Sequence, residues 1–186
     1  LISGVRLSVN GVKRLVDSNI NPSRGFKLDV DITYEKNNFI EGLDLSDAGT
    51  LVPNWANNDL WRIQQSSSLF FSIPTTNRMT ISLESIAGTI SNVEADSFFH
   101  FFGGGLNGLK GYPFYSIEGK SFAIATGTLR IPIFREKHIP IGWFIMQNSA
   151  LGFIGQAGDA WTQNIDEPNW SRSVGIQWRI NGFSFY

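Results

Sequence analysis

Three glycines within FFGGGLNGLKGY (101–112) have the spacing of a phosphate-binding turn. Gly103, Gly105 and Gly108 form a literal G-x-G-x-x-G, which in a dinucleotide site follows a strand and precedes a helix whose amino end faces the pyrophosphate. A further glycine and Pro113 interrupt the chain here before a helical period of apolar residues can begin. The sequence therefore disfavours a nucleotide site and indicates another backbone role for these glycines.

The acidic and imidazole side chains form no familiar catalytic or metal-binding set. Asp29 and Asp31 lie about 7 Å apart on one face of a predicted strand, near the separation of paired glycosidase carboxylates, but alternating acids are equally usual in a water-lined barrel. His100 and His138 have no partner at metal-ligand spacing. The acids of EGLDLSDAG (41–49) lack the ligand order of a calcium loop, which leaves Glu41, Asp44 and Asp47 as a solvated face. We therefore expect neither enzymatic activity nor a cofactor or metal.

Composition excludes several other classes of protein. The 186 residues, 42% of them apolar, suffice for one domain, and 15 basic against 16 acidic side chains give no basic surface for nucleic acid. Cysteine is absent, so disulfides are excluded. No run approaches the roughly 18 apolar residues of a spanning helix, whereas barrel strands leave a weaker trace. Because no leader precedes Leu1, we expect a mature or excised piece.

Alternation of apolar and polar side chains predicts antiparallel β-strands. In FKLDVDITYE (26–35) every second residue is apolar, which gives the strand one apolar and one polar face. The remaining predicted strands, seven in total, are 5–10, 60–74, 79–84, 120–134, 142–158 and 174–181. Almost no helix is expected, since no segment has a sustained helical period.

The predicted connections between strands differ in length. Turn residues fill 19–25, 74–78 and 135–140, whereas 36–59 and 92–119 are expected as long connections. This alternation of short turns and long loops is typical of outer-membrane barrels.

Amphipathic strands fit two architectures. In a water-soluble sandwich or barrel the apolar face points inward, whereas in a membrane barrel it faces lipid. The 15 Phe, 6 Trp and 4 Tyr, several at strand ends, would suit interfacial girdles. Charges on the polar faces would suit a water-filled lumen. Composition leaves both architectures open.

The run SFFHFFGGGLNGLKGYPFYSIEGKSFAIATGTLRIPIF (97–134) resembles the signature of the BamA-like superfamily, the bacterial surface antigen family of outer-membrane assembly and transport barrels. In that family an aromatic strand end and Gly-Gly lead into a long loop with an Arg-Gly-Tyr or Arg-Gly-Phe tip, and the next strand carries a Glu-Tyr-Arg-Phe-Pro-like run. The positions matching the tip are Leu109, Lys110, Gly111 and Tyr112, and those matching the returning strand are Leu129, Arg130, Ile131 and Pro132.

Three other segments follow in the family's order. NPSRGFKLDVDITY resembles its Pro-x-x-Gly strand opening, with Pro22 and Gly25 in place; GFIGQAGDAW resembles its Phe-Val-Asp-Ala-Gly strand, and SVGIQWRI the glycine-rich strand after it. The resemblance implies an antiparallel transmembrane β-barrel of the bacterial outer membrane. Family barrels have sixteen strands, so this single domain, 1–186, would be roughly the second half. The terminal FSFY could instead close an eight-stranded barrel.

The resemblance also implies that loop 92–119 folds into the barrel lumen, where glycines permit tight turns and close backbone approach. The loop glycines concerned are Gly103, Gly104, Gly105, Gly108 and Gly111. A free extracellular loop is the alternative. In the family the tip Arg reaches an Asp on the barrel wall, and the matching positions here are Lys110 and Gln156.

These replacements remove the bidentate charged contact. We expect a single hydrogen bond from Lys110 to the Gln156 carbonyl, or a contact of Lys110 with Asp29 or Asp31. The aromatic side chains that follow the tip should then contribute more to holding the loop; they are Tyr112, Phe114 and Tyr115.

The function implied by the resemblance is assembly or insertion of outer-membrane proteins, or transport of protein or lipid across the outer membrane. The implied partners are outer-membrane lipid, a client or transported protein or lipid, and periplasmic or accessory assembly proteins. The residues themselves leave a second function open, a small β-barrel that binds an apolar ligand or a glycan with its tryptophans.

Overall fold

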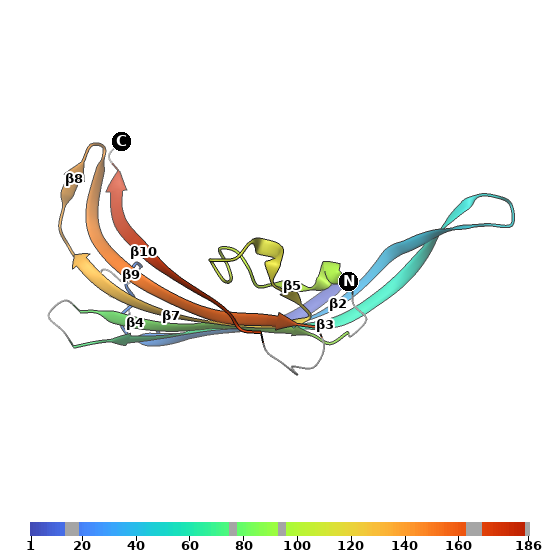
Figure 1. The fold of residues 1–186 in the computed structure, drawn as a ribbon, viewed down its shortest axis with the longest axis horizontal. Coiled ribbons are helices and arrows are strands. Elements are labelled where there is room, and N and C mark those ends of the chain that lie inside the picture. The colour runs from blue at the N-terminus through green and yellow to red at the C-terminus, as the bar shows by residue number, and fades with distance from the viewer. Residues whose placement is uncertain (14–18, 75–77, 93–95, 163–168, 185–186) are drawn as a thin grey trace.

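The computed structural model describes residues 1–13, 19–74, 78–92, 96–162 and 169–184, which form one curved antiparallel sheet (Figure 1). Seven strands are hydrogen-bonded in the order β1-β2-β3-β4-β7-β9-β10, and the short β8 pairs with β9. Their bounds are β1 Ile2–Asn10, β2 Gly25–Leu45, β3 Leu51–Ser72, β4 Thr80–Ile90, β7 Ser121–Phe134, β8 Ile139–Ile141, β9 Phe144–Trp161 and β10 Ser171–Ser184. The all-β, antiparallel prediction is confirmed.

Two strands are much longer than the alternation indicated. β2 and β3 continue through 36–59, which we predicted to be a long connection, and leave only the turn 46–50. Their outer part projects beyond the rest of the sheet as a two-stranded hairpin (Figure 1), with Leu43 and Trp55 exposed by 60% and 57%. Because no core covers either face there, the pairing of the two backbones persists without apolar–polar alternation.

The sheet is open in the described part of the chain. β1 pairs only with β2 and β10 only with β9, so the closed eight-stranded barrel is not formed. The last two residues of FSFY lie outside the described residues, as do 75–77 of the predicted turn 74–78 and 93–95 of the predicted loop 92–119. The architecture observed is therefore a curved sheet with two free edges.

The curvature places the polar faces of the strands on the concave side and the apolar faces on the convex side. Gln156 contacts the loop that lies in the concavity, and its register partners Thr126 and Ser173 share that face. Neighbouring positions along each strand point to the opposite, convex face. The exposed side chains there include Val5, Leu7, Trp61, Leu69, Phe71, Leu83, Phe153, Val174, Ile176 and Trp178.

The hydrophobic core lies between the concave face and the loop that connects β4 to β7. This loop contains two short 3₁₀ turns, η1 (Ser97–Phe99) and η2 (Phe114–Ser116), and the strand pair β5 (Phe101–Phe102) and β6 (Glu118–Gly119). The buried cluster consists of Leu60, Ile90, Phe99, Phe101, Leu109, Ile117, Phe122 and Ile124. No helix among the described residues is long and apolar enough to cross a membrane.

Candidate functional site

The glycine-rich loop is folded onto the sheet. β5 and β6 pair with each other, and the Gly103 amide donates to the Ile117 carbonyl at 2.8 Å, so the two ends of the loop are held together. Between them the tip lies over the concave face (Figure 1). Leu109, the first residue of the predicted tip motif, is fully buried. A free loop, the alternative left by the sequence, is not what the structure contains.

Gln156 of β9 is the polar docking point of this loop. Its amide nitrogen donates to the Gly108 carbonyl and to the Thr126 hydroxyl, both at 3.0 Å. Its amide oxygen accepts from the Lys110 backbone N–H at 3.0 Å and from the Ser173 hydroxyl at 3.1 Å. A side-chain amide has two donors and two acceptor positions, and all four are used. Gln156 is 8% exposed, so these bonds form away from bulk water.

Lys110 contacts Gln156 through a different atom from the one we expected. The backbone amide donates the hydrogen bond, and the residue itself is exposed. Asp31, one of the acids offered as an alternative partner, accepts instead from Arg6 and Thr33, with Thr33 Oγ1 at 2.9 Å. The neutral amide of Gln156 can bind both loop groups, because it accepts from the Lys110 N–H and donates to the Gly108 carbonyl. An ionised carboxylate could accept from Lys110 but could not donate to the carbonyl.

The loop aromatics divide into two groups. Tyr112 reaches β10, an edge strand, where its hydroxyl donates to the Arg172 carbonyl at 3.2 Å and accepts from the Arg172 N–H at 3.3 Å. Phe114 and Tyr115 pack on Phe102 within the loop, with ring centroids 5.6 and 5.0 Å away, and stay 50% and 73% exposed. We expected Phe114 and Tyr115 to hold the loop to the sheet. The buried loop residues of the core make that contact instead; they are Phe99, Phe101, Leu109 and Ile117.

The glycines allow the backbone of the loop to approach itself closely. A Cβ at Gly108 would lie 2.0 Å from the Gly103 carbonyl oxygen, and one at Gly104 would lie 1.9 Å from the Pro113 carbonyl oxygen. Gly105 has a φ of 81°, a conformation that side chains with a Cβ rarely adopt. The G-x-G-x-x-G segment therefore closes a compact turn, and η2 rather than an α-helix follows it.

Gly111, also part of the predicted tip, faces the sheet. A Cβ built on it would lie 3.0 Å from the Ser173 Cβ, so a larger residue there would press against β10. The tip thus approaches β9 through Gly108 and Lys110, and β10 through Gly111 and Tyr112.

Two predicted site residues lie elsewhere. Arg130 and Pro132 belong to the opposite end of β7, where Arg130 pairs in register with Thr80 at the start of β4. Pro132 adjoins a register shift between β7 and β9, a position where a missing amide donor is tolerated. Thr126 and Ser173, in contrast, were missed as site residues. Their only signal in the sequence is that they fall on the same face as Gln156 when the strands are correctly registered.

Metal-ligating side chains do not gather in the part of the chain that the structure describes: no group of three or more His, Cys, Asp or Glu is found there. His100 lies 2.8 Å from Glu118 inside the loop. Comparison with protein-family models finds no match to this chain, and a search of curated proteins also finds none. The site is therefore interpreted from its geometry.

Proposed function

We propose that this chain is part of a transmembrane β-barrel of the bacterial outer membrane, of the BamA-like kind, that assembles or inserts outer-membrane proteins or transports protein or lipid across that membrane. The observation that carries the proposal is the direction in which the sheet curves. Large apolar side chains occupy its convex face, with Leu83 50% and Ile176 73% exposed. Soluble monomers rarely expose contiguous apolar surface of this extent, whereas a membrane barrel requires it.

The concave face supports the same proposal. It carries the polar side chains of the strands and the docked loop, as the lumen of an outer-membrane barrel does. A soluble barrel that binds an apolar ligand, the second function left open by the sequence, requires the opposite arrangement, with apolar side chains inside. The apolar part of the concave face is already covered by the loop core around Leu109.

The free edges of β1 and β10 indicate that further strands are needed to close a barrel. Unpaired backbone N–H and C=O groups each cost several kcal/mol in hydrocarbon, so a sheet of this kind is stable in a membrane only when further strands complete it. In the proposal those strands come from the rest of a longer barrel, of which this chain is about one half. The loop tip would then lie in the lumen, held at β9 and β10 by Gln156 and Tyr112.

The test is reconstitution of the protein with its complete barrel into phospholipid vesicles. We expect it to require detergent or lipid to remain monodisperse and to accelerate the folding of an unfolded outer-membrane protein added to the vesicles. Gly108→Ala, which displaces the loop tip, should lower this activity, whereas Gly155→Ala should not, because nothing lies within 4 Å of a Cβ at Gly155. A protein that is monodisperse in plain buffer would overturn the membrane proposal.

A further inference from the structure

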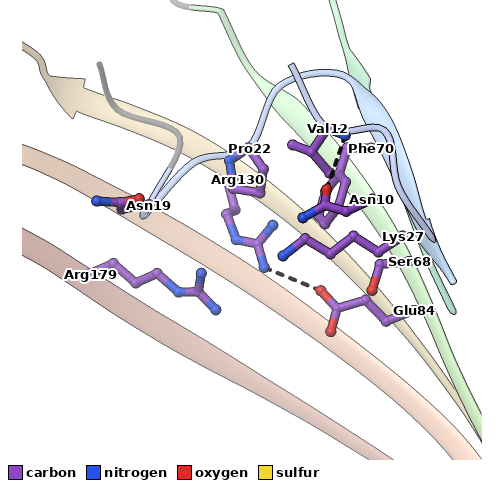
Figure 2. A pocket seen from close by; sticks show the side chains of 10 residues that line it. All are labelled: Asn10, Val12, Asn19, Pro22, Lys27, Ser68, Phe70, Glu84, Arg130 and Arg179. Atoms are coloured by element: carbon purple, nitrogen blue, oxygen red, sulfur yellow. Dashed lines mark hydrogen bonds and ion pairs between the residues drawn. The ribbon is translucent and has the colours of Figure 1, made fainter. Parts of the chain in front are cut away.

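A second polar cluster, whose side chains are drawn in Figure 2, lies on the concave face near the start of β4 and the end of β7. It lines a pocket of about 630 Å³, which is within the usual size range of small-molecule sites. The lining residues on strands that have charge or hydrogen-bonding capacity are Asn10, Lys27, Ser68, Glu84, Arg130 and Arg179, and Asn19 lies in the connection between β1 and β2. The strand residues come from β1, β2, β3, β4, β7 and β10, so the pocket exists only in the assembled sheet.

Arg130 is the buried centre of this pocket. It is 3% exposed, and its Nη1 donates to the Ser82 hydroxyl at 3.0 Å, while Nη2 lies 3.5 Å from Glu84 Oε1. Its Nε is buried and has no acceptor in the described part of the chain. Leaving a donor of a buried cation unpaired is costly, and Glu84 is the only acid the guanidinium contacts among the described residues, so an anion in the pocket would stabilise the charge of Arg130.

The charges around Arg130 do not balance. Lys27 and Arg179 line the same pocket, and Figure 2 shows their cationic groups directed towards the space beside Arg130. Glu84 is the one carboxylate among the lining residues within the described ranges, and it is 38% exposed at its side chain. Among the described lining residues, three cations against one acid leave a surplus of two positive charges, which favours a multiply charged anion.

The connection between β1 and β2 gives the pocket a further wall. Asn21, which is 2% exposed, is hydrogen-bonded to the Thr80 hydroxyl, and the Ile20 carbonyl accepts from Arg179 Nη1 at 3.4 Å. Asn10 Oδ1 accepts from the Val12 N–H at 3.2 Å, so the amide nitrogen of Asn10 is the group left to donate. The pocket is thus a built site with fixed donors.

We propose that this pocket binds a phosphate-bearing ligand. A phosphoryl group carries about −1.5 to −2 charges at neutral pH, which matches the surplus of two. Guanidinium forks and a lysine point charge are the side chains that bind phosphate oxygens best, and neutral donors such as the Asn10 amide complete the set. The pocket volume of about 630 Å³ exceeds that of a phosphate ion, so the site has room for an organic group attached to the phosphate. The site depends only on the concave face and not on the function proposed above.

The experiment uses the purified protein in a phosphate-free maltoside detergent, titrated with inorganic phosphate and with glycerol phosphate by calorimetry. Saturable binding is expected, stronger for the organic phosphate. Lys27→Gln and Arg179→Gln should each weaken it about 10- to 150-fold, since a hydrogen bond to a charged group contributes about 1.5–3 kcal/mol. Lys36→Gln is the matched control, because Lys36 is exposed on the same strand but on its other face. Glu84→Gln should tighten binding.

Two vesicle compositions then identify the source of the phosphate. If phosphatidylglycerol vesicles abolish glycerol phosphate binding and phosphatidylcholine vesicles do not, the ligand is an anionic lipid headgroup; equal binding in both identifies a soluble phosphate compound. Absence of saturable binding, or equal losses in Lys27→Gln and Lys36→Gln, would overturn the proposal. Lys27 and Lys36 are both exposed, so far-ultraviolet circular dichroism of Lys27→Gln and Lys36→Gln should show an unchanged fold.

Discussion

Replacement of Gln156 by leucine tests whether one side chain holds the loop to the sheet. Gln156→Leu keeps most of the apolar volume and removes four hydrogen bonds, two of them to the loop backbone at Gly108 and Lys110. At about 0.5–1.5 kcal/mol net for each bond, the two loop bonds contribute about 1–3 kcal/mol to docking. The apolar core should still favour the docked state, but the open state should become about 5–150 times more populated.

Amide hydrogen exchange followed by mass spectrometry over residues 103–119 measures this opening. The exchange rate of these amides should rise about 5–150-fold in Gln156→Leu, because amide exchange reports the population of the open form of the loop. Gln177→Leu is the matched control, since Gln177 lies on the concave face of β10, opposite Gly152 and away from the loop. Lys110→Ala should be nearly silent, because the backbone of Lys110 makes the contact. Equal exchange in Gln156→Leu and Gln177→Leu would refute the assignment of Gln156 as the docking point.

Three further predictions concern the loop turn, the faces of the sheet and the core. Gly108→Ala should release the loop tip to added protease, because the new Cβ would lie 2.0 Å from a carbonyl oxygen; a tip as protected as in Gly155→Ala would show that the turn is not so tight. Leu28→Arg should cost about 2–4 kcal/mol in unfolding from lipid vesicles and Asp29→Asn almost nothing; equal costs would contradict the assignment of faces. Leu109→Ala should cost about 2–5 kcal/mol of loop docking, measured by exchange at the loop amides, and a smaller effect than that of Gln156→Leu would contradict the apolar core as the main contact.

The strands could be predicted from the sequence wherever one face is apolar and the other polar. Segment 26–35 alternates without a fault and lies inside β2, and segment 174–181 lies inside β10. The continuation of β2 and β3 through 36–59 was missed because the outer part of the hairpin has no covered face and thus no sustained alternation; nearer the sheet, Phe39 still packs on Phe99 of the core. The direction of curvature could not be predicted either, because a period of two places the apolar face on one side without saying which side is concave.

The docking site was predictable only in part. The resemblance drew attention to Lys110 and Gln156, and the two residues are joined by a hydrogen bond. Residue types could not show that the backbone of Lys110 makes this bond, because that depends on how the turn at Gly108 orients the peptide group. The contributions of Thr126 and Ser173 follow from the register of β7 and β10 against β9, which alternation alone does not determine.

The most direct test of the central claim is the environment of neighbouring positions on a central strand. The chain contains no cysteine, so Leu69→Cys and Ser68→Cys each give one site on β3 for a nitroxide spin label. In vesicles containing the complete barrel, we expect the label at Leu69, on the convex face, to collide with dissolved oxygen far more than with a water-soluble nickel complex. The label at Ser68, on the concave face, should show the opposite preference. Greater accessibility to the nickel complex at Leu69 than at Ser68 would contradict a sheet whose convex face is in contact with lipid.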